Sequence, residues 1–137
     1  MQDEIVKRIG RYLRLLKKDF AYDEKRNIFV VKEKRNGQEF VVIIRFSKNW
    51  IMMFSAIENI KNIPEDKLCA VYKKLLEISD QYAEVSFSLT EDGDIVASEE
   101  ILKDALTLDV FLEEYNAIPI AVEVFEREIK PLYKKSE

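Results

Sequence analysis

The chain has 137 residues, of which 47% are hydrophobic and 35% are charged, and its net charge is −4. This length suits one domain, spanning residues 1–137, that buries a core of its own. The single cysteine, the three scattered glycines and the absence of histidine exclude an internal disulfide, a glycine-rich phosphate loop, and Ser-His-Asp or Cys-His catalysis.

Residues 3–20 are predicted to form an amphipathic helix, because apolar side chains recur at spacings of three and four. The apolar stripe comprises Ile5, Ile9, Tyr12, Leu13, Leu16 and Phe20. The opposite face carries a basic stripe made of Lys7, Arg11, Arg14 and Lys18. A solvated outer face is the ordinary role of such a stripe, and docking onto an acidic partner is the alternative. Nucleic acid comes third, because a pI near 5.1 disfavours it.

The segments 27–34, 39–46 and 50–57 predict a three-stranded antiparallel meander, since they are rich in Val, Ile and Phe. Asn36-Gly37 is a strong hairpin signal, because both residue types tolerate positive φ. The second connection spans residues 47–49. If this loop has three residues, one face carries Phe40, Val42, Ile44, Phe46, Trp50, Met52 and Phe54, and the other carries Val41, Ile43, Arg45, Ile51 and Met53.

Both faces of this meander are apolar, so both need a cover. Helices can pack on one face. The second face can be covered by the C-terminal helix, by a second subunit or by a client peptide. A loop one residue longer or shorter would exchange the two faces.

A second helix is expected to begin at Pro64, which suits a first helical position. Its predicted apolar face comprises Leu68, Val71, Tyr72, Leu75 and Leu76. Cys69 lies at the edge of that face, where we expect a small core residue.

A hairpin and a long helix are predicted to complete the chain. The hairpin pairs an alternating apolar strand near residues 85–89 with residues 94–101, across the turn Glu91-Asp92-Gly93. Thr107 can cap the final helix, and Pro119 is expected to kink it or break it in two.

The charge is divided unevenly along the chain. Residues 1–50 contain 13 basic and 7 acidic side chains, a net charge of +6. The remaining residues contain 9 basic and 19 acidic side chains, a net charge of −10. Segments of opposite charge can pair with each other, with a second copy or with another protein.

Paired acids occur at Glu99-Glu100 and Glu113-Glu114. Carboxylate catalysis would need two of these groups in one cleft, whereas solvated positions are the ordinary interpretation. No catalytic, cofactor-binding or metal-binding residue is predicted. A small-molecule binder or a carboxylate-based enzyme is the alternative function.

The order helix, three strands, helix, two strands, helix indicates an α+β fold with an antiparallel sheet. This order, with PEDKLCAVYKKLLEISDQYAEVSFSLTEDGDIVAS at its centre, resembles the YbjN family, which shares the fold of type III secretion chaperones. The resemblance covers most of the chain. It implies a protein that binds other polypeptides, often as a homodimer, and it carries over no catalytic residues.

The residues and the resemblance together predict a non-enzymatic protein-interaction module, chaperone-like or regulatory, that binds a polypeptide and forms a homodimer. Its interface is predicted at Ile43, Ile51 and Met53, with Arg11 and Arg14.

The expected location is the cytoplasm, without a membrane partner. No apolar run approaches the roughly 20 residues that cross a bilayer. The charged segment MQDEIVKRIG lacks the apolar centre of a signal peptide. Abundant Lys, Glu and Ile are typical of a heat-adapted source.

Overall fold

A six-stranded antiparallel sheet, with the strand order β1-β2-β3-β4-β6-β5, forms the centre of the computed structural model, which describes residues 3–134. The strands are β1 (Asp19–Asp23), β2 (Ile28–Arg35), β3 (Gln38–Phe46), β4 (Trp50–Asn59), β5 (Phe87–Leu89) and β6 (Asp94–Leu102). The helices are α1 (Asp3–Leu15), α2 (Leu68–Gln81) and α3 (Leu108–Val124). The predicted α+β class and element order are confirmed, with one additional strand, β1.

The first helix ends five residues earlier than predicted. Lys17 adopts a left-handed conformation with φ 56°. The backbone N–H of Lys18 donates to Leu13 O at 3.0 Å, and that of Lys17 donates to Arg14 O at 3.0 Å. These two bonds are the Schellman motif that ends many helices. The predicted helix over residues 16–20 is therefore wrong, and Phe20 belongs to β1.

Lys18, predicted on the basic stripe of the first helix, lies beyond it. Its Nζ is 3.0 Å from Glu33 Oε2 on β2. The hydroxyl of Tyr115 on α3 donates to the same Glu33 oxygen. This cluster ties the end of α1, strand β2 and α3 together.

The two hairpin turns of the meander differ in how well the sequence predicted them. At the first turn, Asn36 and Gly37 have φ values of 53° and 79°, as expected for an Asn-Gly turn. At the second, the Ser47 N–H donates to Trp50 O at 3.0 Å, so these two residues pair and only residues 48–49 form the turn. The predicted three-residue loop is wrong.

This difference in the turn exchanges the two faces of β4. Ile44 pairs with Met53, and Phe46 pairs with Ile51. The predicted grouping of Ile51 and Met53 with Ile43 is therefore wrong. A shift of one residue in register sends every side chain of a strand to the opposite face.

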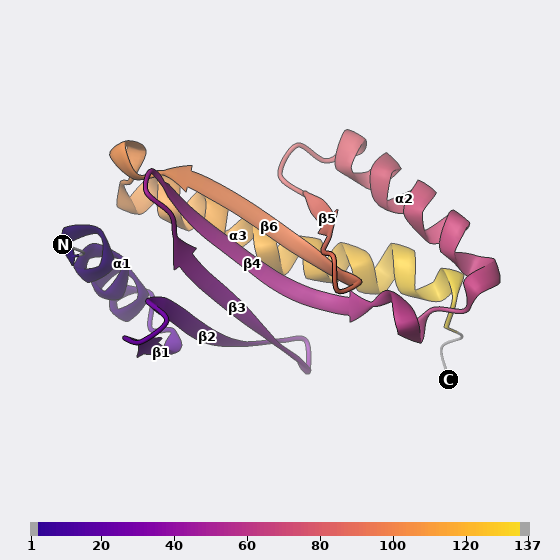
Figure 1. The fold of residues 1–137 in the computed structure, drawn as a ribbon, viewed down its shortest axis with the longest axis horizontal. Helices are drawn as coiled ribbons and strands as arrows, with labels where there is room; N and C mark the ends of the chain where they lie inside the picture. Colours follow the sequence, from indigo (N-terminus) through magenta and orange to yellow (C-terminus); the bar gives the residue numbers. More distant parts are fainter. Residues whose placement is uncertain (1–2, 135–137) are drawn as a thin grey trace.

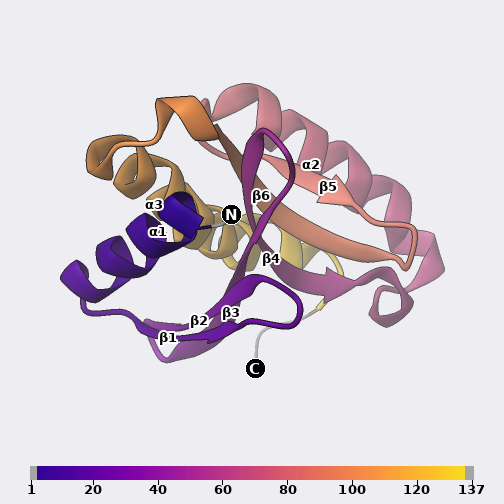
Figure 2. The ribbon, with the colours of Figure 1, turned by 60° about the vertical axis from the view of Figure 1, so that its left-hand side comes forward.

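The three α-helices of residues 3–134 pack on one face of the sheet, which we call the helix-covered face. Helix α3 runs along β4 and β6, while α1 and α2 lie toward opposite ends of the sheet (Figure 1 and Figure 2). Side chains from all three helices join those of this face in one core cluster. Its strand members are Phe29, Val31, Val42, Ile44, Ile51, Met53, Ile95, Ala97 and Ile101.

Helix α3 begins as predicted, with Thr107 Oγ1 accepting from the Val110 N–H at 3.1 Å. The predicted break at Pro119 does not occur, because the helix continues to Val124. The helical hydrogen bonding changes only after Val124, where residues Phe125–Ile129 form a π-helical turn.

Helix α2 buries Val71, Leu75 and Ile78. Two predictions for this helix are wrong: Leu76 is 74% exposed, and Cys69 is exposed rather than in the core. Within residues 3–134, no helix has the length and apolarity that crossing a bilayer requires.

Candidate functional site

A groove of about 400 Å³ lies between α1 and β1, and we call it the α1–β1 groove. It exists because α1 ends early and the chain turns back as a strand beside it. Its lining residues are Val6, Lys7, Gly10, Arg11, Arg14, Phe20, Tyr22 and Phe29.

The floor of the α1–β1 groove is aromatic. The rings of Phe20 and Phe29 lie 5.9 Å apart between centroids, and those of Tyr22 and Phe29 lie 4.8 Å apart. Gly10 lies directly above this floor, because a Cβ at that position would be in ordinary contact, at 3.8 Å, with the Phe29 ring. The glycine, which weakens the helix, thus places no larger side chain over this apolar surface.

The rim of the groove is basic. Lys7, Arg11 and Arg14 occupy successive turns of one helix face, where residues three and four apart are neighbours. Arg11 makes an exposed ion pair with Glu4 at 3.5 Å, which contributes little stability. Three cations above an apolar floor favour a ligand that carries both carboxylates and large apolar side chains.

Strand β1 is an edge strand of the sheet formed by residues 3–134. An edge strand presents backbone N–H and C=O groups that can pair with an added strand. The α1–β1 groove thus combines apolar pockets, positive charge and main-chain pairing capacity at one place.

The second candidate surface is the face of the sheet opposite the helices, which we call the open face. It comprises Val30, Val41, Ile43, Arg45, Trp50, Met52, Phe54, Val96, Glu100 and Leu102, as the strand register dictates. Val41, Trp50 and Leu102 are each 40% or more exposed. No helix of the described chain contributes to it, and its residues lie outside the core cluster.

The predicted interface residues lie on different surfaces of the molecule. Arg11 and Arg14 meet on the rim of the α1–β1 groove, and Ile43 lies half-buried on the open face. Ile51 and Met53 are 0% exposed on the helix-covered face, so their predicted exposure is wrong.

Several residues of both surfaces could not be assigned from the sequence. Phe20 and Tyr22 were hidden because the helical period continued through Leu16 into β1. Trp50, Met52 and Phe54 were assigned to the wrong face by the predicted loop length. Ser47 was the available signal, since its pairing with Trp50 leaves a hairpin turn of two residues.

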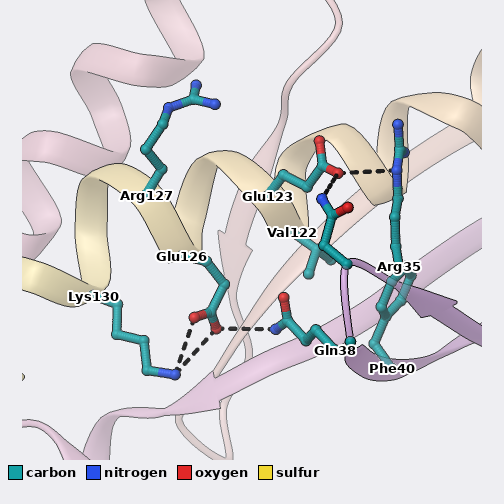
Figure 3. Close-up of a pocket in the computed structure, with 10 residues that line it drawn as sticks. Arg35, Gln38, Phe40, Val122, Glu123, Glu126, Arg127 and Lys130 are labelled. Carbon is teal, nitrogen blue, oxygen red and sulfur yellow. Dashed lines mark hydrogen bonds and ion pairs between the residues drawn. The ribbon is translucent and has the colours of Figure 1, made fainter. Parts of the chain in front are cut away.

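A polar groove of about 680 Å³ lies where the β2–β3 turn meets α3 (Figure 3). Arg35 Nε is 2.9 Å from Glu123 Oε1, and Gln38 Nε2 donates to Glu126 Oε1 at 3.0 Å. Lys130 Nζ is 3.0 Å from Glu126 Oε2. Both carboxylates are thus engaged in holding the turn against the helix, which is a structural role.

Two of the acids that the sequence singled out, Glu99 of β6 and Glu114 of α3, meet at the helix-covered face. Burial and a hydrogen bond with Glu114 raise the pKa of Glu99 to about 8, helped by the charges of Glu114, Glu100 and Glu84. None of these acids lines a groove described above. Residues 3–134 contain no group of three or more His, Cys, Asp or Glu placed to hold a metal ion.

A sequence model of the CesT_Tir_1 family matches residues 2–132. No curated protein sequence matches the chain.

Several solved structures share the fold. A chain of the ExsC–ExsE complex has a TM-score of 0.65 and 14% identity, covering 96% of this chain and 98% of that chain. A chain of the ExoU–SpcU heterodimer from the type III secretion system of Pseudomonas aeruginosa has a TM-score of 0.61 and 11% identity, covering 99% and 100%. YbjN from E. coli has a TM-score of 0.64 and 11% identity, covering 90% and 93%.

Proposed function

Because the chain belongs to the CesT_Tir_1 family of type III secretion chaperones, we propose that it is a non-enzymatic module that binds a segment of another polypeptide. The structures of ExsC–ExsE and of the HopA1–SchA chaperone–effector pair support this proposal, because each is a complex. The described residues show apolar and charged surfaces suited to a polypeptide.

The observation that carries the proposal is the α1–β1 groove, with its aromatic floor, basic rim and adjacent strand edge. An extended segment added to β1 would pair its backbone with the edge and direct alternate side chains toward the groove. Acidic residues in that segment would approach Lys7, Arg11 and Arg14. The bound class is therefore an acidic segment with large apolar residues at alternate positions.

The apolar contacts supply most of the affinity in this proposal. Burying one large apolar side chain stabilises a complex by roughly 1.5–3 kcal/mol. The exposed cations contribute mainly to the rate of association and to the choice of partner. Partners with basic segments would be repelled.

We extend the proposal to self-association as a homodimer in the cytoplasm. Opposite net charges on the two parts of the chain suit pairing between copies. A single cysteine, Cys69, can form no internal disulfide and suits a reducing compartment.

The proposal is tested with a short fluorescent peptide in which Leu or Phe alternates with Glu, measured by anisotropy. The R11E/R14E variant should bind it at least about tenfold more weakly, since two cations become repulsive anions. The matched control is K61E/K67E, which makes the same change in charge near α2.

A second pair of variants tests the floor of the groove without changing charge. The Gly10→Leu side chain would fill the space above Phe29, whereas Gly10→Ala adds a Cβ at ordinary contact distance. Binding should be lost in the first and kept in the second. Equal affinity for a Lys-containing version of the peptide, or unchanged binding in both R11E/R14E and Gly10→Leu, would refute the proposed site.

A further inference from the structure

We propose that the open face binds an amphipathic α-helix of another protein, which lies along β4 with an acidic flank beside Arg45 and a basic flank beside Glu100. This inference goes beyond the groove proposed above, because it concerns another surface and another form of polypeptide. It rests on the pairing of β4, on the order of side chains across the strands and on their charges.

Strand β4 offers a partner its side chains rather than its backbone. Over residues 50–54 it lies between β3 and β6, so its backbone N–H and C=O groups are used within the sheet. A partner that covers it must satisfy its own backbone hydrogen bonds, as an α-helix does. Helix α3 covers the opposite face of β4 and β6 in this way (Figure 1). A second helix would complete a helix layer on each face of the sheet.

Side chains of the open face lie in rows across the sheet, because antiparallel partners sit side by side. Arg45 pairs with Met52, and Met52 pairs with Glu100. One row therefore reads base, apolar residue, acid across β3, β4 and β6. Along β4, the residues Trp50, Met52 and Phe54 form an apolar strip between the two charges.

The spacing of the two charges matches the width of a helix. Arg45 and Glu100 sit on strands separated by β4, two strand spacings or about 10 Å apart. An α-helix with its side chains is about 10–12 Å wide. A helix seated on the apolar strip would therefore have the base beside one flank and the acid beside the other.

The apolar strip and its two charges are open to a partner. Arg45 and Glu100 are both exposed. Arg45 places its guanidinium carbon 5.5 Å from the centroid of the Phe54 ring, which holds the cation at the edge of the strip. Trp50 is 43% exposed, and Trp and Arg are enriched among the residues that dominate binding energy. Apolar side chains left in water beside charged ones are typical of an interaction site.

The two charges select the class of helix. A helix with acids on both flanks would place one of them against Glu100, and a helix with bases on both flanks would oppose Arg45. Like charges that face each other lower the affinity and exclude wrong partners. The partner is therefore a helix with large apolar residues three and four positions apart, acids along one flank and bases along the other.

Trp50 is the only tryptophan of the chain, so its fluorescence reports whether the open face is covered. The probe is a Trp-free peptide of about 15 residues, long enough to form a helix. It carries Leu on one face, Glu along one flank and Lys along the other. Binding should shift the Trp50 emission to shorter wavelengths, because water leaves the ring. Peptides with Glu on both flanks or Lys on both flanks should bind at least about tenfold more weakly.

Charge reversals should change this preference rather than abolish binding. R45E has an acid on each side of the apolar strip, so it should prefer the peptide with Lys on both flanks by at least about tenfold. E100R should prefer the peptide with Glu on both flanks. The R45E/E100R double variant should again prefer the mixed peptide. R11E/R14E, which changes only the α1–β1 groove, should bind the mixed peptide as the wild-type chain does.

Four results would overturn the inference. One is a Trp50 emission that none of the helical peptides shifts. A second is equal affinity for the three peptides in the wild-type chain and in both single reversals. A third is binding that is lost in R11E/R14E, which would assign the helix to the α1–β1 groove. The fourth is an emission that shifts with protein concentration alone while the molar mass doubles, since a second copy would then cover the open face.

The peptide in which Leu or Phe alternates with Glu tests the α1–β1 groove separately. Failure of the helical peptides therefore leaves the proposed groove standing, and failure of the alternating peptide leaves the open-face proposal standing.

Discussion

Strand β4 presents two rows of side chains that look alike in sequence and lie in opposite environments. Ile51 and Met53 point to the helix-covered face and are 0% exposed. Trp50, Met52 and Phe54 point to the open face, where no helix of residues 3–134 packs. Both rows are apolar, so apolarity alone does not identify the core.

Burial under a helix, rather than apolar composition, decides how much each side chain contributes to the stability of the fold. An apolar residue under α3 lowers the free energy of the folded chain when it leaves water. A residue of the open face that stays partly in water, such as Trp50, contributes less to folding and can gain more when another molecule covers it. The two faces therefore separate folding from association, and matched substitutions in neighbouring positions measure that separation.

The largest contrast is expected between the adjacent methionines. Met53→Ala should reduce the free energy of unfolding by about 2–5 kcal/mol, because it leaves a cavity in the core. Met52→Ala should cost the single chain about 1 kcal/mol or less, since its side chain is half-buried. Urea unfolding of dilute protein measures both values. Equal losses of stability in the two variants would show that the open face is covered in the single chain, which would remove the contrast.

A smaller contrast is expected between the adjacent acids of β6. Met53 pairs with Glu99, and Met52 pairs with Glu100. Glu99 therefore lies on the helix-covered face and Glu100 on the open face. The pKa of Glu99 is raised from 4.5 to about 8, first by burial and then by Glu114, while Glu100 and Glu84 add repulsion. The protonated form of Glu99 is thus the stable one in the fold.

The sign of the pH dependence follows from that shift. The contribution of Glu99 to stability is fully present below its ordinary pKa of 4.5 and is lost as the pH rises through 8. At this half-buried position, solvent screening limits the loss to about 1–2 kcal/mol. Glu99→Gln should flatten the decline in unfolding free energy between pH 5 and pH 9, and Glu100→Gln should retain it. A decline that persists in Glu99→Gln would assign it to another group.

Much of the fold could be predicted because its signals are local. The helical stripe that buries Ile9 and Leu13, the Asn36-Gly37 turn and the Thr107 cap each depend on a few neighbouring residues. The end of α1 could not be predicted, because Lys17 takes the left-handed position where Gly is the usual residue. Strand β1 was not predicted for the same reason, because the expected helix extended to Phe20.

The candidate sites were harder to predict, because each is formed by residues that lie far apart in the sequence. The α1–β1 groove needs Phe29 of β2 beneath Gly10 of α1, a contact that no local pattern encodes. The open face needed the correct turn at Ser47, where one residue of loop length exchanges the faces. Only Arg11 and Arg14 could be placed on a candidate surface from the helical period.

The smallest contrast concerns the serines of the two faces. Ser55 pairs with Ala97 on the helix-covered face and is 1% exposed, and its hydroxyl has no hydrogen-bond partner among residues 3–134. Ser98 pairs with Phe54 on the open face. A buried hydroxyl without a partner costs free energy that the smaller Ala side chain avoids.

Ser55→Ala should therefore raise the free energy of unfolding by up to about 1 kcal/mol, since the gain is partly offset by a small cavity. Ser98→Ala should change it by less than about 0.5 kcal/mol, as expected for a site in contact with water. Thermal unfolding of dilute protein can resolve the difference. A destabilised Ser55→Ala variant would mean that the hydroxyl has a water partner inside the core, and that the helix-covered face is wetter than its apolar neighbours indicate.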